Sequence, residues 1–262
     1  MASFGQVLSG AEVLEDGLAL DVPESWHQGR TAYGGFSAAL TLAVAQQAGG
    51  EGLPPLRSAQ MAMMAPVNGG VEVRARIERA GRNAIWISSA IHGEKGLAFS
   101  ASFVFMGAVE SALHINERPV PEGLVPADEA HPVAYTRHTP AFLASHFETR
   151  HALPPSAERR PEMCRWVRLA ERDGIDPMVE LLLVGDALPP GVMPLMHAAV
   201  PVSTMHWQVN LLTPAPRTRD GWWLMRSIGD YAEKGCSSER EATWNASGEP
   251  VMAGMQSIAL FG

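Results

Sequence analysis

The feature of this sequence that most constrains its fold is an order of elements that occurs twice along the chain. In the first part, apolar residues at helical spacing from Phe36 to Ala48 predict a helix, and strand-like segments follow it. In the second part, a predicted helix over 177–188 is again followed by strand-like segments. Because short turns separate successive strands, each part is predicted to be a helix with an antiparallel meander, and the chain to be an internal duplication.

The alternation of apolar residues and the turns between them set the bounds of the predicted strands. A proline-rich stretch with no sustained periodicity separates the two parts and predicts a connector rather than a packed element. We therefore expect an N-terminal repeat over 1–107, a connector over 108–140 and a C-terminal repeat over 141–262. The strands are expected at 12–14, 18–22, 55–64, 71–79, 84–92, 98–106, 146–152, 163–170, 200–212, 222–230, 239–245 and 251–261.

Charge and composition exclude several functional classes. The chain has 28 acidic and 20 basic residues and no run of Lys or Arg, so we expect no nucleic-acid partner. No apolar stretch is long enough to span a membrane, and the N-terminus lacks the pattern of a secretory signal. The two cysteines, Cys164 and Cys236, lack metal-ligand spacing, and we expect both to be buried. These features favour a cytoplasmic protein without a metal site.

The common catalytic and cofactor motifs are absent from the sequence. Neither a glycine-rich nucleotide loop nor a zinc-binding His-Glu-x-x-His motif occurs. The segment GFSAA around Ser37 fails the nucleophile-elbow pattern at its last position and lies inside a predicted helix. We therefore expect no bound cofactor and no covalent serine or cysteine intermediate.

One glutamine interrupts the last predicted strand, EPVMAGMQSIALFG. By alternation, Gln256 shares a strand face with Met252 and Ile258. A carboxamide has two donors and two acceptor sites to satisfy, and apolar neighbours offer few partners. Gln256 is therefore expected either to anchor a structural hydrogen-bond network or to contact a ligand.

Two further polar residues occupy costly positions. Asp186 ends an apolar helical segment, where its carboxylate either caps the helix or serves a site beside it. Thr204 lies on a predicted strand whose alternation places it on one polar face with His206 and Gln208. Such a face is typical of a solvated sheet surface, so Thr204 alone does not indicate a site.

The two repeats differ at one matched position. Aligning HGEKGLAFSASF with NASGEPVMAGMQS places Ser102 opposite Gln256. Such a difference is expected if only one of two pseudo-symmetric sites kept its chemistry, and it is equally expected from neutral drift.

Taken together, these positions resemble the double-hotdog acyl-CoA thioesterases of the thioesterase II family. The likeness covers nearly the whole chain and includes an R-x-x-[YF]-G-G segment at the first helix, formed here by Arg30, Tyr33, Gly34 and Gly35. The resemblance implies an α+β fold of two tandem hotdog repeats, each a long helix wrapped by an antiparallel sheet. It also implies that the catalytic residues are Asp186, Thr204 and Gln256.

The resemblance implies hydrolysis of acyl-CoA to a free fatty acid and CoA by an oriented water molecule, in a homo-oligomer that we expect to be a dimer. The expected substrate-binding residues are Tyr33, Gly34, Gly35 and His206. The flexible side chains of Met61, Met63 and Met64 either line an acyl groove or pack in the core. The chain departs from the family pattern at His206 and Thr213, where an Asp and a basic residue are frequent.

Two other functions remain open from the sequence. A hotdog hydratase or dehydratase acting on enoyl-CoA would share the fold, but its usual histidine is not matched by the spacing of His197. A module that binds acyl groups without catalysis is the other alternative, because a fold does not by itself determine an activity.

Overall fold

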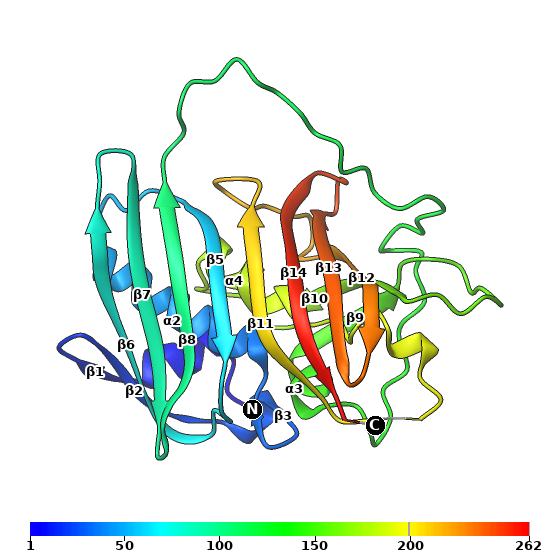
Figure 1. The fold of residues 1–262 in the computed structure, drawn as a ribbon, viewed down its shortest axis with the longest axis horizontal. Coiled ribbons are helices and arrows are strands. Elements are labelled where there is room, and N and C mark those ends of the chain that lie inside the picture. The colour runs from blue at the N-terminus through cyan, green and yellow to red at the C-terminus, as the bar shows by residue number, and fades with distance from the viewer. Residues whose placement is uncertain (199, 262) are drawn as a thin grey trace.

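The computed structural model describes residues 1–198 and 200–261, so residues 199 and 262 of the expected C-terminal repeat lie outside the described part. A 12-stranded antiparallel sheet forms the centre of the molecule, in the order β1-β2-β6-β7-β8-β5-β11-β14-β13-β12-β10-β9 (Figure 1). A separate two-stranded sheet joins β3 and β4. The strands are β1 (Glu12–Leu14), β2 (Gly17–Val22), β3 (His27–Gln28), β4 (Thr31–Ala32), β5 (Leu56–Met63), β6 (Gly69–Ala80), β7 (Ala84–Gly93), β8 (Gly96–Met106), β9 (Phe147–His151), β10 (Glu162–Leu169), β11 (Val202–Leu211), β12 (Trp223–Glu233), β13 (Cys236–Asn245) and β14 (Pro250–Leu260).

The strand order repeats about the centre of the large sheet. The neighbours β6-β7-β8-β5 of the first part are mirrored by β12-β13-β14-β11 of the second. The two parts join where β5 and β11 pair antiparallel, with Trp207 opposite Met61. The predicted element order of a duplicated helix and meander is therefore present, and it is built into one continuous sheet.

The two long helices lie side by side on one face of the sheet, which we call the inner face (Figure 1). They are α2 (Gly34–Gly49) and α4 (Pro177–Gly185), and most of their residues are buried. A helix that is apolar around its whole circumference is stable only when it is enclosed, which the wrapping sheet achieves here. Among the described helices, none combines the length and apolarity that crossing a membrane requires.

Helix α4 is three residues shorter than the 177–188 predicted from the sequence. Its last helical residue is Gly185, and Asp186 has left helical geometry with φ −106° and ψ 13°. The prolines at 189 and 190 restrict the preceding backbone and cannot donate helical hydrogen bonds. The helix therefore ends at the carboxylate that the sequence singled out.

Two short helices were not predicted from the sequence. Helix α1 (Phe4–Gly10) begins with a capping box, in which the Ser3 hydroxyl accepts from the Gln6 N–H and the Gln6 side chain accepts from the Ser3 N–H. The Ser-x-x-Gln spacing was the signal for this helix. Helix α3 (Ala141–His146) covers part of the region that was expected to be loop before β9.

The expected connector over 108–140 is packed against the second part of the sheet, contrary to the prediction. Val120, Val125 and Ala130 belong to a hydrophobic cluster with the indoles of Trp166, Trp222 and Trp244. Trp166 Nε1 donates to the Val125 carbonyl at 2.7 Å. A sheet face that carries tryptophans needs a cover, and this segment supplies it without regular helices or strands. The division at 107 and 140 itself stays a prediction.

The two cysteines differ in exposure. Cys164 is half-buried, and its removal from water raises the pKa of its thiol to about 12. Cys236 is exposed at the start of β13, so the prediction that both cysteines are buried was wrong. Cys236 lies beside the β12–β13 turn, where its side chain is open to solvent.

Candidate active site

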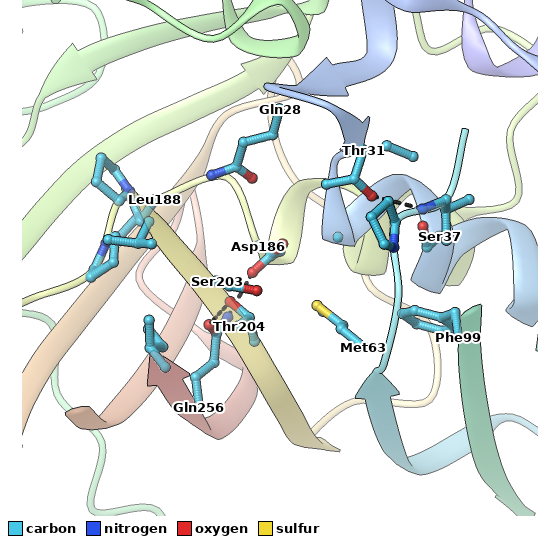
Figure 2. Close-up of a pocket in the computed structure, with 18 of the residues that line it drawn as sticks. Gln28, Thr31, Ser37, Met63, Phe99, Asp186, Leu188, Ser203, Thr204 and Gln256 are labelled. Carbon is cyan, nitrogen blue, oxygen red and sulfur yellow. Dashed lines mark hydrogen bonds between the residues drawn. The ribbon is translucent and has the colours of Figure 1, made fainter. Parts of the chain in front are cut away.

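A cavity of about 240 Å³ lies between the start of α2, the end of α4 and the central strands of the sheet. Both parts of the chain contribute polar and apolar side chains to its lining (Figure 2). Asp186, Thr204 and Gln256 lie together on one side, and Met63 and Phe99 lie on the other. The full lining is Gln28, Thr31, Ala32, Gly34, Ser37, Met63, Met64, Ala65, Pro66, Val67, Phe99, Asp186, Leu188, Pro189, Pro190, Val202, Ser203, Thr204, Ser227, Glu239, Glu241, Gln256 and Ile258.

The three residues proposed from the resemblance form one chain of hydrogen bonds. Gln256 Nε2 donates to Asp186 Oδ1 at 2.6 Å. Thr204 Oγ1 donates to Gln256 Oε1 at 2.9 Å. The amide therefore has a fixed orientation, because its oxygen accepts from the threonine and its nitrogen donates to the carboxylate. Residues from a helix end and two strands, far apart in the sequence, converge here.

A β-bulge brings Thr204 to this chain. Pairing between β11 and β14 shifts between Thr204 and His206, so one extra residue stands in β11. The extra residue reverses the alternation, and Thr204 faces the cavity on the same side of the sheet as the buried Trp207. The prediction that Thr204 shares a face with His206 was therefore wrong.

The structure does not bring His206 to the cavity. Its side chain is exposed on the opposite, outer face of the sheet, where it borders an open groove with Gln60 and Ser102. Ser102 was matched to Gln256 in the sequence, but this exposed residue lies on the outer face of β8. Its inward neighbour Ala101, which pairs with Met61, occupies the position that corresponds to Gln256.

The pKa of Asp186 is raised to about 7, chiefly because its carboxyl is removed from bulk water. The hydrogen bonds from Gln256 and from the backbone amide of Gly35 act in the opposite direction by stabilising the ionised form. A carboxyl that titrates near neutrality can take up a proton and release it again near physiological pH.

The glycines of the predicted R-x-x-[YF]-G-G segment have two different roles. Gly34 lines the cavity, and a Cβ built there would lie 2.4 Å from Asp186 Oδ2. At Gly35 a Cβ would lie 2.6 Å from the carbonyl oxygen of Leu183 on α4. Gly34 thus leaves room for the carboxylate, and Gly35 allows α2 and α4 to approach closely.

Tyr33 is placed in the core and not along the cavity. Its hydroxyl donates to the Leu183 carbonyl at 2.7 Å, and its ring stacks on Phe142 with a centroid distance of 4.0 Å. Burial raises the pKa of this phenol well above its usual range. Of the four residues expected to bind substrate, Gly34 alone lines the cavity among the described residues.

The sequence reasoning missed the polar residues that β12 and β13 contribute to the cavity: Ser227, Glu239 and Glu241. Trp207 Nε1 donates to Glu241 Oε2 at 2.8 Å. Alternating polar residues in a strand are usually solvent-facing, so their spacing gave no signal that they point inward. Within residues 1–198 and 200–261, no group of three or more His, Cys, Asp or Glu side chains could hold a metal ion.

The comparisons with known proteins agree with this architecture. The fold is similar to that of a conserved protein of unknown function with a hot dog fold from Alicyclobacillus acidocaldarius, with 16% identity, a TM-score of 0.85 and coverage of 100% of this chain and 99% of that chain. It is also similar to the acyl-CoA thioesterase II TesB2 from Mycobacterium marinum, with 17% identity, a TM-score of 0.77 and coverage of 99% of each chain. The predicted α+β double hotdog fold is confirmed.

Comparison of the sequence with protein-family models gives a more specific result than comparison with these distant structures. No curated protein matches the sequence. The acyl-CoA thioesterase N-terminal domain matches residues 22–106, and the acyl-CoA thioesterase C-terminal domain matches residues 121–260. Since the two domains follow each other in order and together cover most of the chain, the protein belongs to the acyl-CoA thioesterase family and is a thioester hydrolase.

Proposed function

We propose that the protein hydrolyses acyl-CoA to a free carboxylic acid and CoA, and that Asp186, Thr204 and Gln256 orient and activate the attacking water. The hydrogen-bonded chain of these three side chains at the cavity is the observation that supports this proposal most directly. A carboxylate with a pKa of about 7 beside a cavity suits a general base.

The reaction needs a water molecule held close to the thioester carbon. Asp186 accepts the proton of this water as its oxygen attacks the carbonyl carbon. The Gln256 amide keeps the carboxylate in place, and Thr204 keeps the amide in place. When the tetrahedral intermediate collapses, the carbon–sulfur bond breaks and the proton on Asp186 passes to the departing CoA sulfur. The carboxylate is then ready for another cycle.

The start of α2 is placed to stabilise the negative oxygen of the intermediate. Its N-cap residue, Tyr33, makes no side-chain capping hydrogen bond, so the Gly34 N–H lacks that partner, whereas the Gly35 N–H already donates to Asp186. Gly34 borders the cavity at this point and has no side chain to keep a carbonyl away. Backbone N–H groups at a helix start are suitable oxyanion donors.

The acyl group is proposed to enter beside Met63, Met64 and Phe99, which line the apolar side of the cavity. Methionine side chains adapt to ligands of different shape because they are unbranched and flexible. Met61 was the third methionine expected near an acyl chain, but it is 2% exposed and belongs to the core.

Replacement of Asp186 by Asn tests the proposal. We expect release of CoA to fall by at least about a hundredfold, because the amide cannot act as a base. The control is Asp230→Asn, which changes an exposed carboxylate paired with Arg240 outside the cavity and should leave the rate unchanged. A rate for Asp186→Asn close to that of the parent enzyme would remove Asp186 from the mechanism.

A panel of acyl-CoA substrates of graded length defines the substrate class, and two further measurements address the alternatives. Hydration of crotonyl-CoA without release of CoA would favour a hydratase. Tight acyl-CoA binding without turnover would favour a binding module.

The proposal extends to assembly and compartment. We propose a homodimer that acts in fatty acid metabolism in the cytoplasm. Light scattering after size-exclusion chromatography tests the dimer, and a monomer under assay conditions would contradict it.

A further inference from the structure

The inner face of β13 is polar over its whole length, although its side chains are buried or line the cavity. The inward residues are Ser237, Glu239, Glu241, Thr243 and Asn245. The corresponding strand of the first repeat, β7, presents Ile85, Ile87, Ser89 and Ile91 on its inner face. The two corresponding strands therefore present different chemistry to the interior, although the repeats have the same fold.

Glu239 has a structural explanation. Glu239 Oε2 accepts from the Gly191 N–H at 2.6 Å and from the Ser227 hydroxyl at 2.8 Å. Glu239 Oε1 accepts from the Ser237 hydroxyl at 3.0 Å and from the Val192 N–H at 3.5 Å. These donors fill both carboxylate oxygens, so Glu239 ties the loop after α4 to the sheet.

Glu241 is one inward position further along β13 and has only part of this support. Its Oε2 accepts from Trp207 Nε1 at 2.8 Å. Its Oε1 has no hydrogen-bond partner among residues 1–198 and 200–261, and no Lys or Arg is among the residues that line the cavity. Because Asp186 and Glu239 line the same cavity, the groups around Glu241 do not favour a negative charge on it.

The protonation of Glu241 follows from these surroundings. Burial raises the pKa of its carboxyl well above the usual range, and the charge of Asp186 raises it further. A protonated carboxyl is a hydrogen-bond donor as well as an acceptor. In this form, Glu241 can both donate a hydrogen bond to a group in the cavity and accept one from it.

We propose that Glu241 determines substrate specificity by hydrogen bonding to an oxygen substituent on the acyl chain. The preferred substrates are short acyl-CoA thioesters that carry a hydroxyl or oxo group. This inference rests on the proposed function, because it names the acyl class that the same site takes. An unsubstituted hydrocarbon chain would exclude water from Glu241 and leave its free oxygen without a partner.

The size of the cavity supports a short acyl group. About 240 Å³ lies below the range of roughly 300–1,000 Å³ that is usual for sites of drug-sized ligands. A chain of a few carbons that enters past Met63 and Met64 reaches a cavity that Glu239 and Glu241 of β13 also line. A substituent near the thioester is therefore within the part of the site that Glu241 lines.

The test compares 3-hydroxybutyryl-CoA with butyryl-CoA, which differ by one hydroxyl group. For the parent enzyme we expect kcat/KM to be about tenfold or more higher for the hydroxylated substrate, the factor that one unpaired buried polar group implies. In Glu241→Leu the ratio should fall close to one, mainly because the hydroxylated substrate loses its advantage. In Glu241→Gln, which retains a donor and an acceptor, most of the preference should remain.

Met64→Leu is the matched control, because it changes the apolar side of the same cavity and should affect both substrates alike. A parent enzyme with no preference, or a preference that Glu241→Leu retains, would overturn the inference. If Glu241→Leu does not fold, the ratio of kcat/KM for the two substrates in the parent enzyme and in Glu241→Gln still tests the inference. If neither thioester is hydrolysed and no acyl-CoA of the graded panel is hydrolysed either, the proposed function has failed. If both thioesters are hydrolysed with a preference for butyryl-CoA, only the role of Glu241 is refuted.

Discussion

The dependence of the rate on pH is the sharpest prediction from the site, because a single carboxyl group is proposed as the base. Asp186 has a pKa of about 7, raised by its burial. If only its ionised form accepts the proton of water, kcat/KM rises with pH and levels off above the pKa. For one titrating group, the rate at pH 6 should be roughly a tenth of the maximum and at pH 8 roughly nine tenths.

Removing the Gln256 amide should move this profile in a known direction. The hydrogen bond from Gln256 Nε2 stabilises the ionised carboxylate, so its loss raises the pKa of Asp186. A hydrogen bond to a charged group is worth about 1 kcal/mol more than one to a neutral group, which corresponds to a rise of about one pH unit in the inflection. Gln256→Met should therefore shift the inflection upward and also lower the plateau, because the water is less well held.

The assay follows the loss of thioester absorbance, since thiol reagents themselves respond to pH. Initial rates at substrate concentrations well below KM give kcat/KM for the free enzyme. Burial raises the pKa of the Glu241 carboxyl, which lines the cavity, and of the Tyr33 phenol, which lies in the core, well above the usual range of each. A flat profile between pH 5.5 and 8.5, or a downward shift in Gln256→Met, would refute Asp186 as the base.

Three further predictions follow from the same residues. Asp186→Asn should stabilise the fold at pH 8 but not at pH 4. The raised pKa of Asp186 lowers the free energy of unfolding of the parent protein by at most about 4 kcal/mol as pH rises from about 4 to 7. Equal urea midpoints for the two proteins at pH 8 would contradict this. Gly34→Ala should reduce kcat at least about tenfold, because its Cβ would displace the Asp186 carboxylate, whereas Gly10→Ala, with open space around its Cβ, should not. Thr204→Val should lower kcat about tenfold by releasing the Gln256 amide, and Thr204→Ser should restore it, as steady-state kinetics can check.

The sequence was most informative where apolar residues recurred with one constant spacing over many residues. The helical spacing of α2 and the alternation in the meanders predicted the duplicated order of elements. Such periodic patterns arise because one face of a helix or strand is buried. Asp186 and Gln256 stood out for the related reason that a polar group among apolar neighbours needs a partner. The structure gives each of them the other as that partner.

The sequence failed where a local irregularity or a long-range contact decides the result. One extra residue in β11 reverses which side chains point inward, and no spacing rule showed that the bulge lies between Thr204 and His206. Glu241 has the alternating pattern of a solvated strand, and only the folded structure shows that its side chain lines a cavity. The segment over 108–140 has no period because it packs through irregular backbone against tryptophans of another element.

The two ends of the helix pair carry carboxylates with different surroundings. At the end of α4, Asp186 accepts from Gln256 and faces the cavity. At the opposite end of the helix pair, Asp176 accepts from Gln46 at 3.1 Å and also from the first N–H groups of α4. This second carboxylate caps a helix, and β8 places Ala101 where β14 places Gln256. The first repeat therefore contributes the helix start, Met63 and Phe99 to the cavity, and the second contributes the three proposed catalytic side chains.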